Sequence, residues 1–168
     1  MVTTYKANPN FKNRPKPVNG IIIHSMGEYI GGQPASDFLE SLGLSAHYLI
    51  NVDGSITKCV EPEKQAYHAG KSKWKGEEHL NKSFIGIEIL VEGDHTYDSF
   101  LQAIKNPDTF NSLQYEACLN LCRILMSRFN IDKENIVRHS DVSGINVRPD
   151  PKQDVGSGFE WNKFKLLL

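Results

Sequence analysis

The sequence predicts an α/β fold in which a single domain has a mixed central β-sheet flanked by helices. Its 168 residues amount to about one domain of typical size, enough for a hydrophobic core of its own. Two short, strongly apolar runs, residues 20–24 and 84–91, have the composition of buried central strands. Strand patterns alternate along the chain with segments of helical periodicity, which is typical of helices packed on a sheet.

The composition excludes several classes of function. Apolar residues make up 39% and charged residues 23% of the chain, as in ordinary globular proteins, which excludes a disordered or collagen-like chain. The net charge of -1 offers no basic surface for phosphate backbones or anionic lipids, so we expect no nucleic-acid partner. No run approaches the roughly 20 apolar residues of a membrane span, and the first residues lack the apolar core of a signal peptide. We therefore expect no membrane partner and a cytoplasmic location, with a phage-encoded or nonclassically exported protein as the alternative.

The first elements follow from local composition. Residues 1–17 contain four basic residues and three prolines, which predicts an extended N-terminal arm and places the folded domain at 18–168. The run 20–24 (GIIIH) predicts a buried strand whose last residue is His24. Residues 34–42 predict a short helix with a proline in its first turn.

A β-hairpin is predicted next. Residues 45–51 and 55–60 have strand patterns, and the Asp-Gly pair at 53–54 between them favours a tight turn. Residues 69–82 are polar and without period, which predicts a loop. Residues 84–91 (FIGIEILV) then predict the second central strand.

The C-terminal half is predicted to be mainly helical. Residues 92–111 are polar and irregular, and a loop of this length is often a lid or a binding loop. Apolar residues recur at helical spacing through 112–129, which predicts the longest helix. A short strand at 136–137 leads to His139, and the segment from Phe159 onward predicts a closing helix.

The three cysteines are predicted to be reduced thiols. Their odd number and their spacing match neither a zinc ribbon nor a disulfide framework. Cys118 and Cys122, four residues apart on a predicted helix, could share a metal, but two small apolar residues on a buried helix face are favoured. A cysteine hydrolase that uses Cys59 and a histidine stays open as a different class of mechanism.

Polar residues within or directly after the apolar strands are the candidates for chemistry. His24 and His139 each follow a buried run, and Glu88 interrupts the second one. Burying such groups costs free energy unless another group compensates it. Gly86 and Glu88 share one face of their strand, so the glycine leaves room over that face. Desolvation there would raise the pKa of the carboxyl toward the range that suits a general base.

Two histidines from separate strands, with one carboxylate, would form a zinc site. The loop after His139 offers Asp141, Asp150 and Asp154 as the third ligand. Three such ligands suit Zn²⁺ and leave the fourth position for a water molecule whose pKa can fall to about 7. Two other interpretations stay open at this point: a buried histidine can be an ordinary core residue, and Glu88 can be half of a structural ion pair.

Six segments in chain order carry a resemblance to a known family. They are 21–24 (IIIH), 45–50 (SAHYLI) with the Asp-Gly pair that follows, 66–70 (AYHAG), 83–88 (SFIGIE), 138–141 (RHSD) and 152–154 (KQD). Together they resemble the zinc-dependent N-acetylmuramoyl-L-alanine amidases, which include phage lysozyme-amidases and are related to animal peptidoglycan recognition proteins. The resemblance covers nearly the whole chain, and six motifs in order make it highly specific.

The resemblance implies a bacterial cell-wall hydrolase, active in cell-wall degradation or peptidoglycan recycling. Its substrate would be peptidoglycan or a muropeptide, cut at the amide between N-acetylmuramic acid and the L-alanine of the stem peptide. By position, the zinc ligands would be His24, His139 and Asp154. Glu88 would be the general base, and Lys152 the cation that stabilises the tetrahedral oxyanion. The sequence points to no partner protein.

Other histidines and a tryptophan have weaker assignments. His68 resembles a family position that lines the substrate groove, so we expect a substrate contact, with a turn-stabilising histidine beside Gly70 as the alternative. Trp74 lies in the predicted loop at 69–82 and could stack on a sugar, or it could shield the core at the rim. His79 and His95 are expected to be solvated.

The loop that carries the third ligand is longer than the family pattern. Two alignments of the family pattern fit this loop in part. One takes Asp154 as the ligand and Lys152 as the cation, and the other takes Asp150 and Arg148. The spacing to the aromatic residues that follow favours the first. The main alternative function is a peptidoglycan-binding module without catalysis; such modules usually lack a zinc ligand, whereas a complete candidate set is present here.

Overall fold

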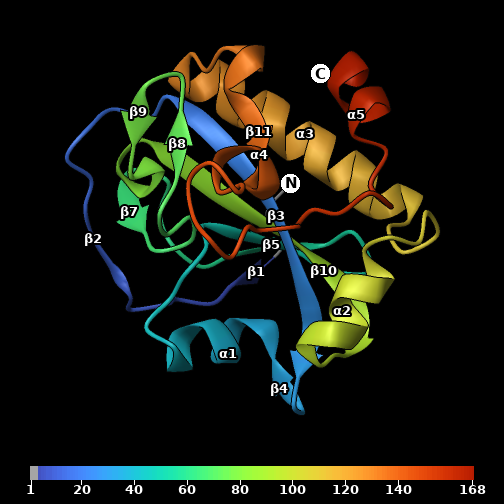
Figure 1. Cartoon of the computed structure of the whole chain (residues 1–168). Helices are drawn as coiled ribbons and strands as arrows, with labels where there is room; N and C mark the ends of the chain where they lie inside the picture. The colour runs from blue at the N-terminus through green and yellow to red at the C-terminus, as the bar shows by residue number, and fades with distance from the viewer. Residues whose placement is uncertain (1–3) are drawn as a thin grey trace.

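A computed structural model describes residues 4–168, and Figure 1 shows its central mixed β-sheet with helices packed around it. Within this part of the chain the sheet has seven strands, in the order β1-β6-β5-β10-β3-β11, with β4 paired to β3. The strands are β1 (Thr4–Tyr5), β3 (Gly20–Ile30), β4 (Gln33–Pro34), β5 (Tyr48–Ile50), β6 (Ile56–Lys58), β10 (Phe84–Asp94) and β11 (Ile136–Arg138). The predicted fold class is confirmed.

The two apolar runs form the centre of this sheet. Strands β3 and β10 are parallel neighbours, and their register places His24 beside Glu88. The expectation that the first strand ends at His24 is wrong, because β3 continues to Ile30. Pairing with β10 extends the strand past the apolar run, and Ser25 and Gly27, which interrupt the apolar pattern, line a cavity.

The predicted hairpin is present, and the segment expected to form an arm contains two short strands. Strands β5 and β6 are antiparallel, with Ile50 opposite Ile56 across the Asp-Gly turn. In the arm, β1 pairs with β6, and β2 (Phe11–Asn13) pairs with β7 (Lys64–Ala66). This segment is therefore attached to the rest of the fold by two short strands.

The longest helix begins and ends where its periodicity predicts. Helix α3 (Ser112–Phe129) is preceded by a capping box, in which the Asn111 side chain accepts from the Gln114 backbone and the Gln114 side chain accepts in return. Its buried face includes Cys118 and Cys122, both fully buried in the main core. The structure thus places these two thiols as apolar core residues, and all three cysteines are free.

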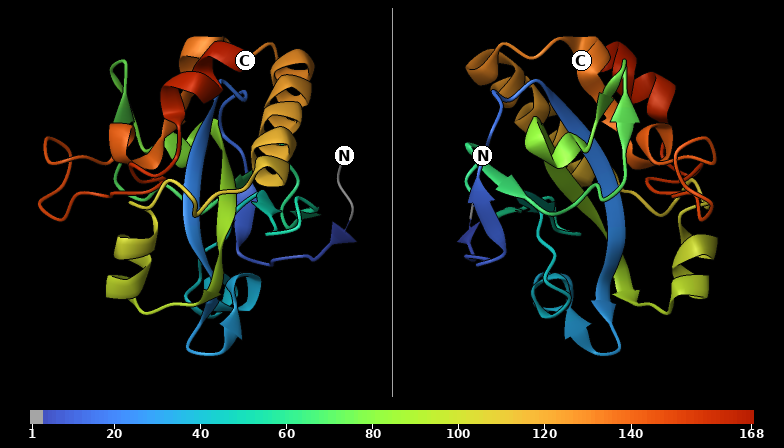
Figure 2. Two further views of the ribbon diagram at one scale, coloured as in Figure 1. Left: turned by 90° about the vertical axis from the view of Figure 1, so that its right-hand side faces the viewer. Right: turned by 60° about the vertical axis from the view of Figure 1, so that its left-hand side comes forward.

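The two faces of the sheet have different roles. Alternate residues of the central strands, such as Ile21 and Ile87, join the core that α3 and α5 (Trp161–Leu167) cover. Figure 2 shows α3 lying along this side of the sheet. The residues between them, such as His24 and Glu88, face the other side. The candidate chemistry therefore lies on the face opposite the main helical layer.

Two predicted loops contain regular structure. The segment 69–82 includes the hairpin β8 (Lys73–Trp74) and β9 (Glu77–Glu78) and the turn η1 (Leu80–Lys82). The segment 92–111 includes helix α2 (Tyr97–Ala103), which has no buried residue and therefore shows little apolar periodicity. Thr96 caps this helix by accepting from the Ser99 backbone, and that short motif is a sequence signal for its start.

The remaining elements are short. Helix α1 (Ala35–Ser41) confirms the first predicted helix, and α5 confirms the closing one. The turn η2 (Lys133–Asn135) precedes β11, and α4 (His139–Val142) begins directly after it. Among the described residues, no helix is both long and apolar enough to span a membrane.

Candidate metal centre

Three elements bring the candidate ligands together. His24 lies in the middle of β3, and His139 is the first residue of α4, directly after the neighbouring strand β11. Asp154 comes from the long loop between α4 and α5. This loop is attached at the ligand and at the residue after it: the Ser140 amide donates to the Asp154 carbonyl at 2.9 Å, and the Ser25 hydroxyl donates to the Val155 carbonyl at 3.4 Å.

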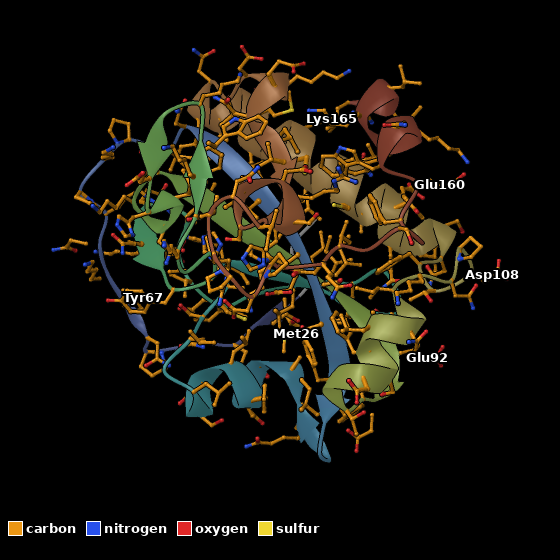
Figure 3. All side chains as sticks on the ribbon, viewed as in Figure 1. Met26, Tyr67, Glu92, Asp108, Glu160 and Lys165 are labelled. Carbon is orange, nitrogen blue, oxygen red and sulfur yellow. The ribbon has the colours of Figure 1, made fainter. Side chains whose placement is uncertain are left out.

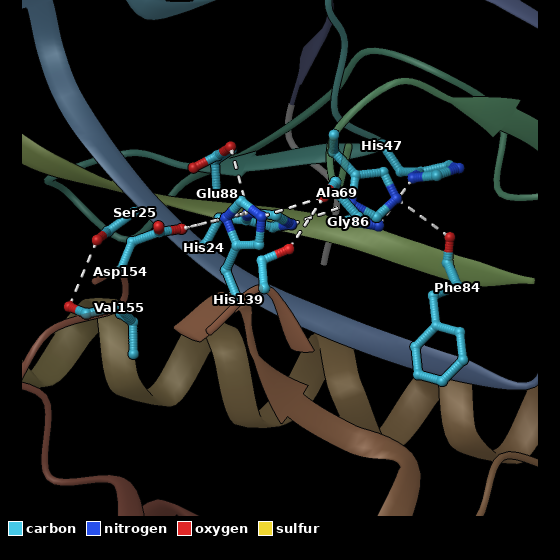
Figure 4. A network of polar contacts seen from close by, with 12 residues as sticks. His24, Ser25, His47, Ala69, Phe84, Gly86, Glu88, His139, Asp154 and Val155 are labelled. Carbon is cyan, nitrogen blue, oxygen red and sulfur yellow. Dashed lines mark hydrogen bonds and ion pairs between the residues drawn. The ribbon is translucent and has the colours of Figure 1, made fainter. Parts of the chain in front are cut away.

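The three ligand atoms form a compact triangle (Figure 4). Nδ1 of His24 and Nδ1 of His139 are 3.0 Å apart. Oδ2 of Asp154 lies 3.3 Å from the first and 2.9 Å from the second. Zinc ligands at about 2.0–2.2 Å in tetrahedral geometry lie roughly 3.3 Å from one another, so the spacing suits this ion.

The direction of one hydrogen bond supports a cation at this point. Nε2 of His139 lies 3.3 Å from the carbonyl oxygen of Ala69, which can only accept. A neutral His139 therefore carries its proton on Nε2 and turns the lone pair of Nδ1 toward His24 and Asp154. Lone pairs and a carboxylate that converge in a buried site need a positive charge between them, so the residues present fit a divalent metal.

The electrostatics of the cluster agree with this arrangement. Burial, and then the charge of His139, lower the pKa of His24 to about 4, so this imidazole is neutral at pH 7 and free to act as a ligand. Burial alone would raise the pKa of Asp154, but the neighbouring His139 and His24 outweigh it and hold this pKa well below its usual range. Both residues are therefore in the protonation state that a metal requires.

Glu88 lies beside the cluster with a free oxygen. Its side chain is buried, Oε1 is 3.9 Å from Nδ1 of His24, and Oε2 has no hydrogen-bond partner among the described residues. Burial, and then the charge of Asp154, raise the pKa of Glu88 well above its usual value, while Lys152 acts in the opposite direction. A buried carboxylate with an unpaired oxygen can take up a proton from a molecule in the adjacent cavity.

A cavity of about 310 Å³ opens onto the cluster, and its lining contains both polar and apolar residues. Lys152 and Gln153 belong to the polar part of the lining. The apolar and aromatic part comes from β3, α1, α2 and nearby loops. Its residues are Met26, Ile30, Phe38, Leu39, Leu44, Tyr67, Tyr97, Phe100 and Leu101. Figure 3 labels two of them, Met26 and Tyr67.

The structure separates the three aspartates that were candidates for the third ligand. Asp150 is 71% exposed and pairs with Arg148, whose Nε donates to it at 2.9 Å. Asp141 accepts from Arg138 at 2.7 Å. Asp154 alone of the three joins the two histidines. Lys152, the cation that the sequence pairs with Asp154, lines the cavity.

His68 and Trp74 occupy different positions. His68 lines the cavity and also contacts a candidate ligand, because its Nδ1 lies 3.0 Å from Nε2 of His24. The Trp74 ring packs on a core cluster that includes Leu80, and its Nε1 donates to Asn135 at 3.3 Å. Trp74 is absent from the residues that line the cavity in the described part of the chain. This placement matches the alternative role of shielding the core.

Some residues of the site were not predicted from the sequence. His95 lines the cavity, although it was expected to be solvated, and Gly27 makes room for its ring. The apolar side chains of α2 were missed together with the helix. Cys59 is buried, and burial raises its pKa to about 11, so the thiolate that a cysteine hydrolase needs is disfavoured.

Comparisons with known proteins agree with this geometry. The model of the N-acetylmuramoyl-L-alanine amidase family matches residues 14–156. The chain is similar to the 1,6-anhydro-N-acetylmuramyl-L-alanine amidase AmpD of Enterobacter cloacae, with 34% identity over 127 residues, which is 76% of this chain and 58% of that protein. It is also similar to the AmpD of Haemophilus influenzae, with 30% identity over 94% of this chain and 87% of that protein.

The fold is shared with solved structures. A crystal structure of a selenomethionine derivative of AmpD superposes with a TM-score of 0.77 and 26% identity, over 99% of this chain and 94% of that one. The family model spans most of the chain, from the arm to the loop that carries Asp154. The chain therefore belongs to the N-acetylmuramoyl-L-alanine amidase family.

Proposed function

We propose that this protein is a zinc-dependent N-acetylmuramoyl-L-alanine amidase that releases the stem peptide from muropeptides. One observation carries the proposal: three ligand atoms within 3.3 Å of one another lie beside the buried carboxylate of Glu88, whose Oε1 is 3.9 Å from Nδ1 of His24 and whose Oε2 has no hydrogen-bond partner among the described residues. The zinc ligands would be His24, His139 and Asp154. Membership of the family and the names of the relatives support the same reaction.

The residues of the site have separate roles in this reaction. A zinc ion held by the three ligands would polarise the scissile carbonyl and lower the pKa of a water molecule. Glu88 takes the proton of the attacking water at its free oxygen and delivers it to the leaving nitrogen of L-alanine. Lys152 faces the same cavity and stabilises the negative charge that develops on the carbonyl oxygen.

The substrate class is part of the proposal. Both curated relatives are named as amidases for the 1,6-anhydro form of the muramyl sugar. We therefore propose soluble anhydromuropeptides, the fragments handled in peptidoglycan recycling, as the substrate in preference to the intact wall. The cytoplasmic location stays a prediction from the sequence.

The substitution Glu88→Gln tests the proposed reaction. It keeps the size of the side chain and removes the base, so we expect peptide release from an anhydromuropeptide to fall by about 10²–10⁴-fold while zinc stays bound. Mass spectrometry of the released peptide and metal analysis of the same sample measure both quantities. Glu92→Gln, at the exposed end of β10, is the matched control. A parent protein that binds zinc and muropeptide but releases no peptide would instead be a binding module.

A further inference from the structure

Two consecutive residues, His68 and Ala69, contact the outer ring nitrogens of both candidate histidine ligands. Nε2 of His24 lies 3.0 Å from Nδ1 of His68. Nε2 of His139 lies 3.3 Å from the carbonyl oxygen of Ala69. Both contacts lie on the side of the rings that faces away from the ligand atoms. The His68–Ala69 segment therefore contacts both histidines on the side opposite the ligand atoms. Figure 4 labels Ala69 together with His24 and His139.

The acceptor at the end of this chain of contacts, the Phe84 carbonyl oxygen, fixes the positions of the ring protons on His68 and His24. Nε2 of His68 is 3.2 Å from the Phe84 carbonyl oxygen, which can only accept, so a neutral His68 carries its proton there. Its Nδ1 is then an acceptor, and Nε2 of His24 must be the donor. The lone pair on Nδ1 of His24 is thereby directed toward the other two ligands.

Close packing on β10 fixes the ring of His68. A Cβ atom on Gly86 would lie 2.4 Å from Cγ of His68, so the ring rests on the glycine backbone. Gly86 has no side chain on the strand face that carries Glu88, and the imidazole of His68 fills the space that this leaves. Any larger residue at this position would displace the ring from His24.

Asn81 fixes the backbone of the same segment. Its Oδ1 accepts from the amides of both His68, at 3.2 Å, and Ala69, at 2.8 Å. Arg14 of the N-terminal arm supports the other end of the network, because its Nη1 donates to the carbonyls of Asn81 and Phe84 at 3.1 and 3.3 Å. The arm thus contributes to the surroundings of the cluster although it lies outside the cavity.

We propose that His68 is the positioning residue of the metal ligand His24, and that Asn81 holds the His68–Ala69 segment against both histidines. The proposal rests on the zinc amidase function proposed above and assigns two residues to the metal site that are not ligands. Outer-shell partners of this kind fix the tautomer and the orientation of a ligand, and their loss typically lowers metal affinity by about 10–100-fold.

The unmodified protein provides the first test. Long-range ¹H–¹⁵N spectra of the metal-free and the zinc-loaded protein identify the protonated nitrogen of each histidine. We expect the proton of His24 on Nε2 in both samples. A proton on Nδ1 of His24 in the metal-free protein would overturn the proposal. The metal-free spectrum tests His68 even if the protein binds no zinc, so failure of the proposed function is distinguished from failure of this inference.

Paired variants provide the second test, with zinc affinity measured by competition against a chelator. His68→Phe keeps a ring but removes the acceptor, so we expect zinc to bind about 10–100-fold more weakly. His68→Asn places an oxygen near the position of Nδ1 and should restore most of this affinity. His79→Asn, at an exposed histidine between β9 and η1, is the control and should bind zinc like the parent.

The role of Asn81 is tested in the same way. Asn81→Leu removes the accepting oxygen and should weaken zinc binding, whereas Asn81→Asp retains it and should bind close to the parent level. Asn120→Leu, on the exposed face of α3, controls for the change in side-chain chemistry. Folded His68→Phe and Asn81→Leu proteins, confirmed by urea unfolding, that bind zinc as tightly as the parent would contradict the proposal.

Discussion

His24 on β3 and Glu88 on β10 are direct neighbours in parallel register, and Nδ1 of the first lies 3.9 Å from Oε1 of the second. Because side chains at matched positions of adjacent strands point to the same face, a candidate zinc ligand and the candidate base are fixed relative to each other by the sheet itself. The pairing of the two central strands therefore sets the distance between ligand and base.

The third ligand is tested by two neighbouring aspartates. Asp154→Ala removes a carboxylate that lies within 3.3 Å of both histidine ligand atoms, so we expect zinc affinity to fall by more than the roughly 10–100-fold typical of an outer-shell residue, and peptide release to be lost. Asp150→Ala removes only an exposed partner of Arg148 and should keep both properties. Metal analysis and muropeptide hydrolysis on both variants check this; the reverse pattern would assign the ligand to Asp150.

Lys152 is expected to act on the reaction and not on metal binding. Lys152→Met should lower kcat by about 10²–10³-fold, because it removes the charge that stabilises the developing oxyanion, while the zinc content stays unchanged. Arg148→Met is the matched control, since Arg148 pairs with exposed Asp150. Steady-state kinetics on an anhydromuropeptide measure both effects. A larger loss in Arg148→Met than in Lys152→Met would reverse the assignment.

Gly86 is expected to tolerate no side chain. In Gly86→Ala the new methyl group would lie 2.4 Å from the His68 ring, so we expect a loss of about 1–3 kcal/mol in the free energy of unfolding and weaker zinc binding. Urea unfolding and chelator competition measure the two effects. Gly144→Ala, whose methyl group would meet only one backbone oxygen at 3.2 Å, is the milder control. Equal stability and affinity in the two variants would show that the His68 ring is not held by this contact.

His47 is expected to make stability depend on pH. Burial, and then the charge of Arg14, lower the pKa of His47 to about 3, whereas an unfolded histidine titrates near 6.5. Between these values the unfolded chain binds a proton that the folded protein excludes. The contribution of His47 to the free energy of unfolding is therefore complete above about pH 6.5 and is lost as the pH falls toward 3. Uptake of one proton on unfolding changes the free energy of unfolding by about 1.4 kcal/mol per pH unit.

His47→Asn removes the imidazole that takes up a proton on unfolding. It keeps an acceptor for the Gly86 amide, which donates to Nδ1 of His47 at 2.9 Å. Urea unfolding of the metal-free parent and variant at pH 6.5 and 4.5 measures the difference. We expect the parent to lose more stability than the variant over this interval. Parallel pH profiles in the two proteins would show that His47 does not contribute.

Much of the fold follows from local patterns. Helix α3 begins and ends at the predicted residues because its apolar positions recur at helical spacing, and the hairpin follows from its Asp-Gly turn. Strand β3 was predicted too short because residues after His24 face a cavity, so burial no longer selects apolar side chains there. Helix α2 was missed because it buries none of its residues.

The candidate site is predicted in part for similar reasons. His24, Glu88 and His139 stand out because each is a polar residue within or directly after an apolar strand run. The second role of His68 could not be predicted, because it depends on the packing of the ring over Gly86 in a different segment. The place of Asp154 follows from the path of a long loop, which the sequence restricts only to two alternatives.

The central claim is that the cluster of His24, His139 and Asp154 holds the zinc on which amide hydrolysis depends. The most direct measurement is stem-peptide release from a purified anhydromuropeptide by the protein as prepared, after chelation, and after zinc is added back. We predict that activity is lost on chelation and restored by zinc, in proportion to the metal bound. Full activity in the chelated protein with no residual metal, or no release in the zinc-loaded protein, would contradict the claim.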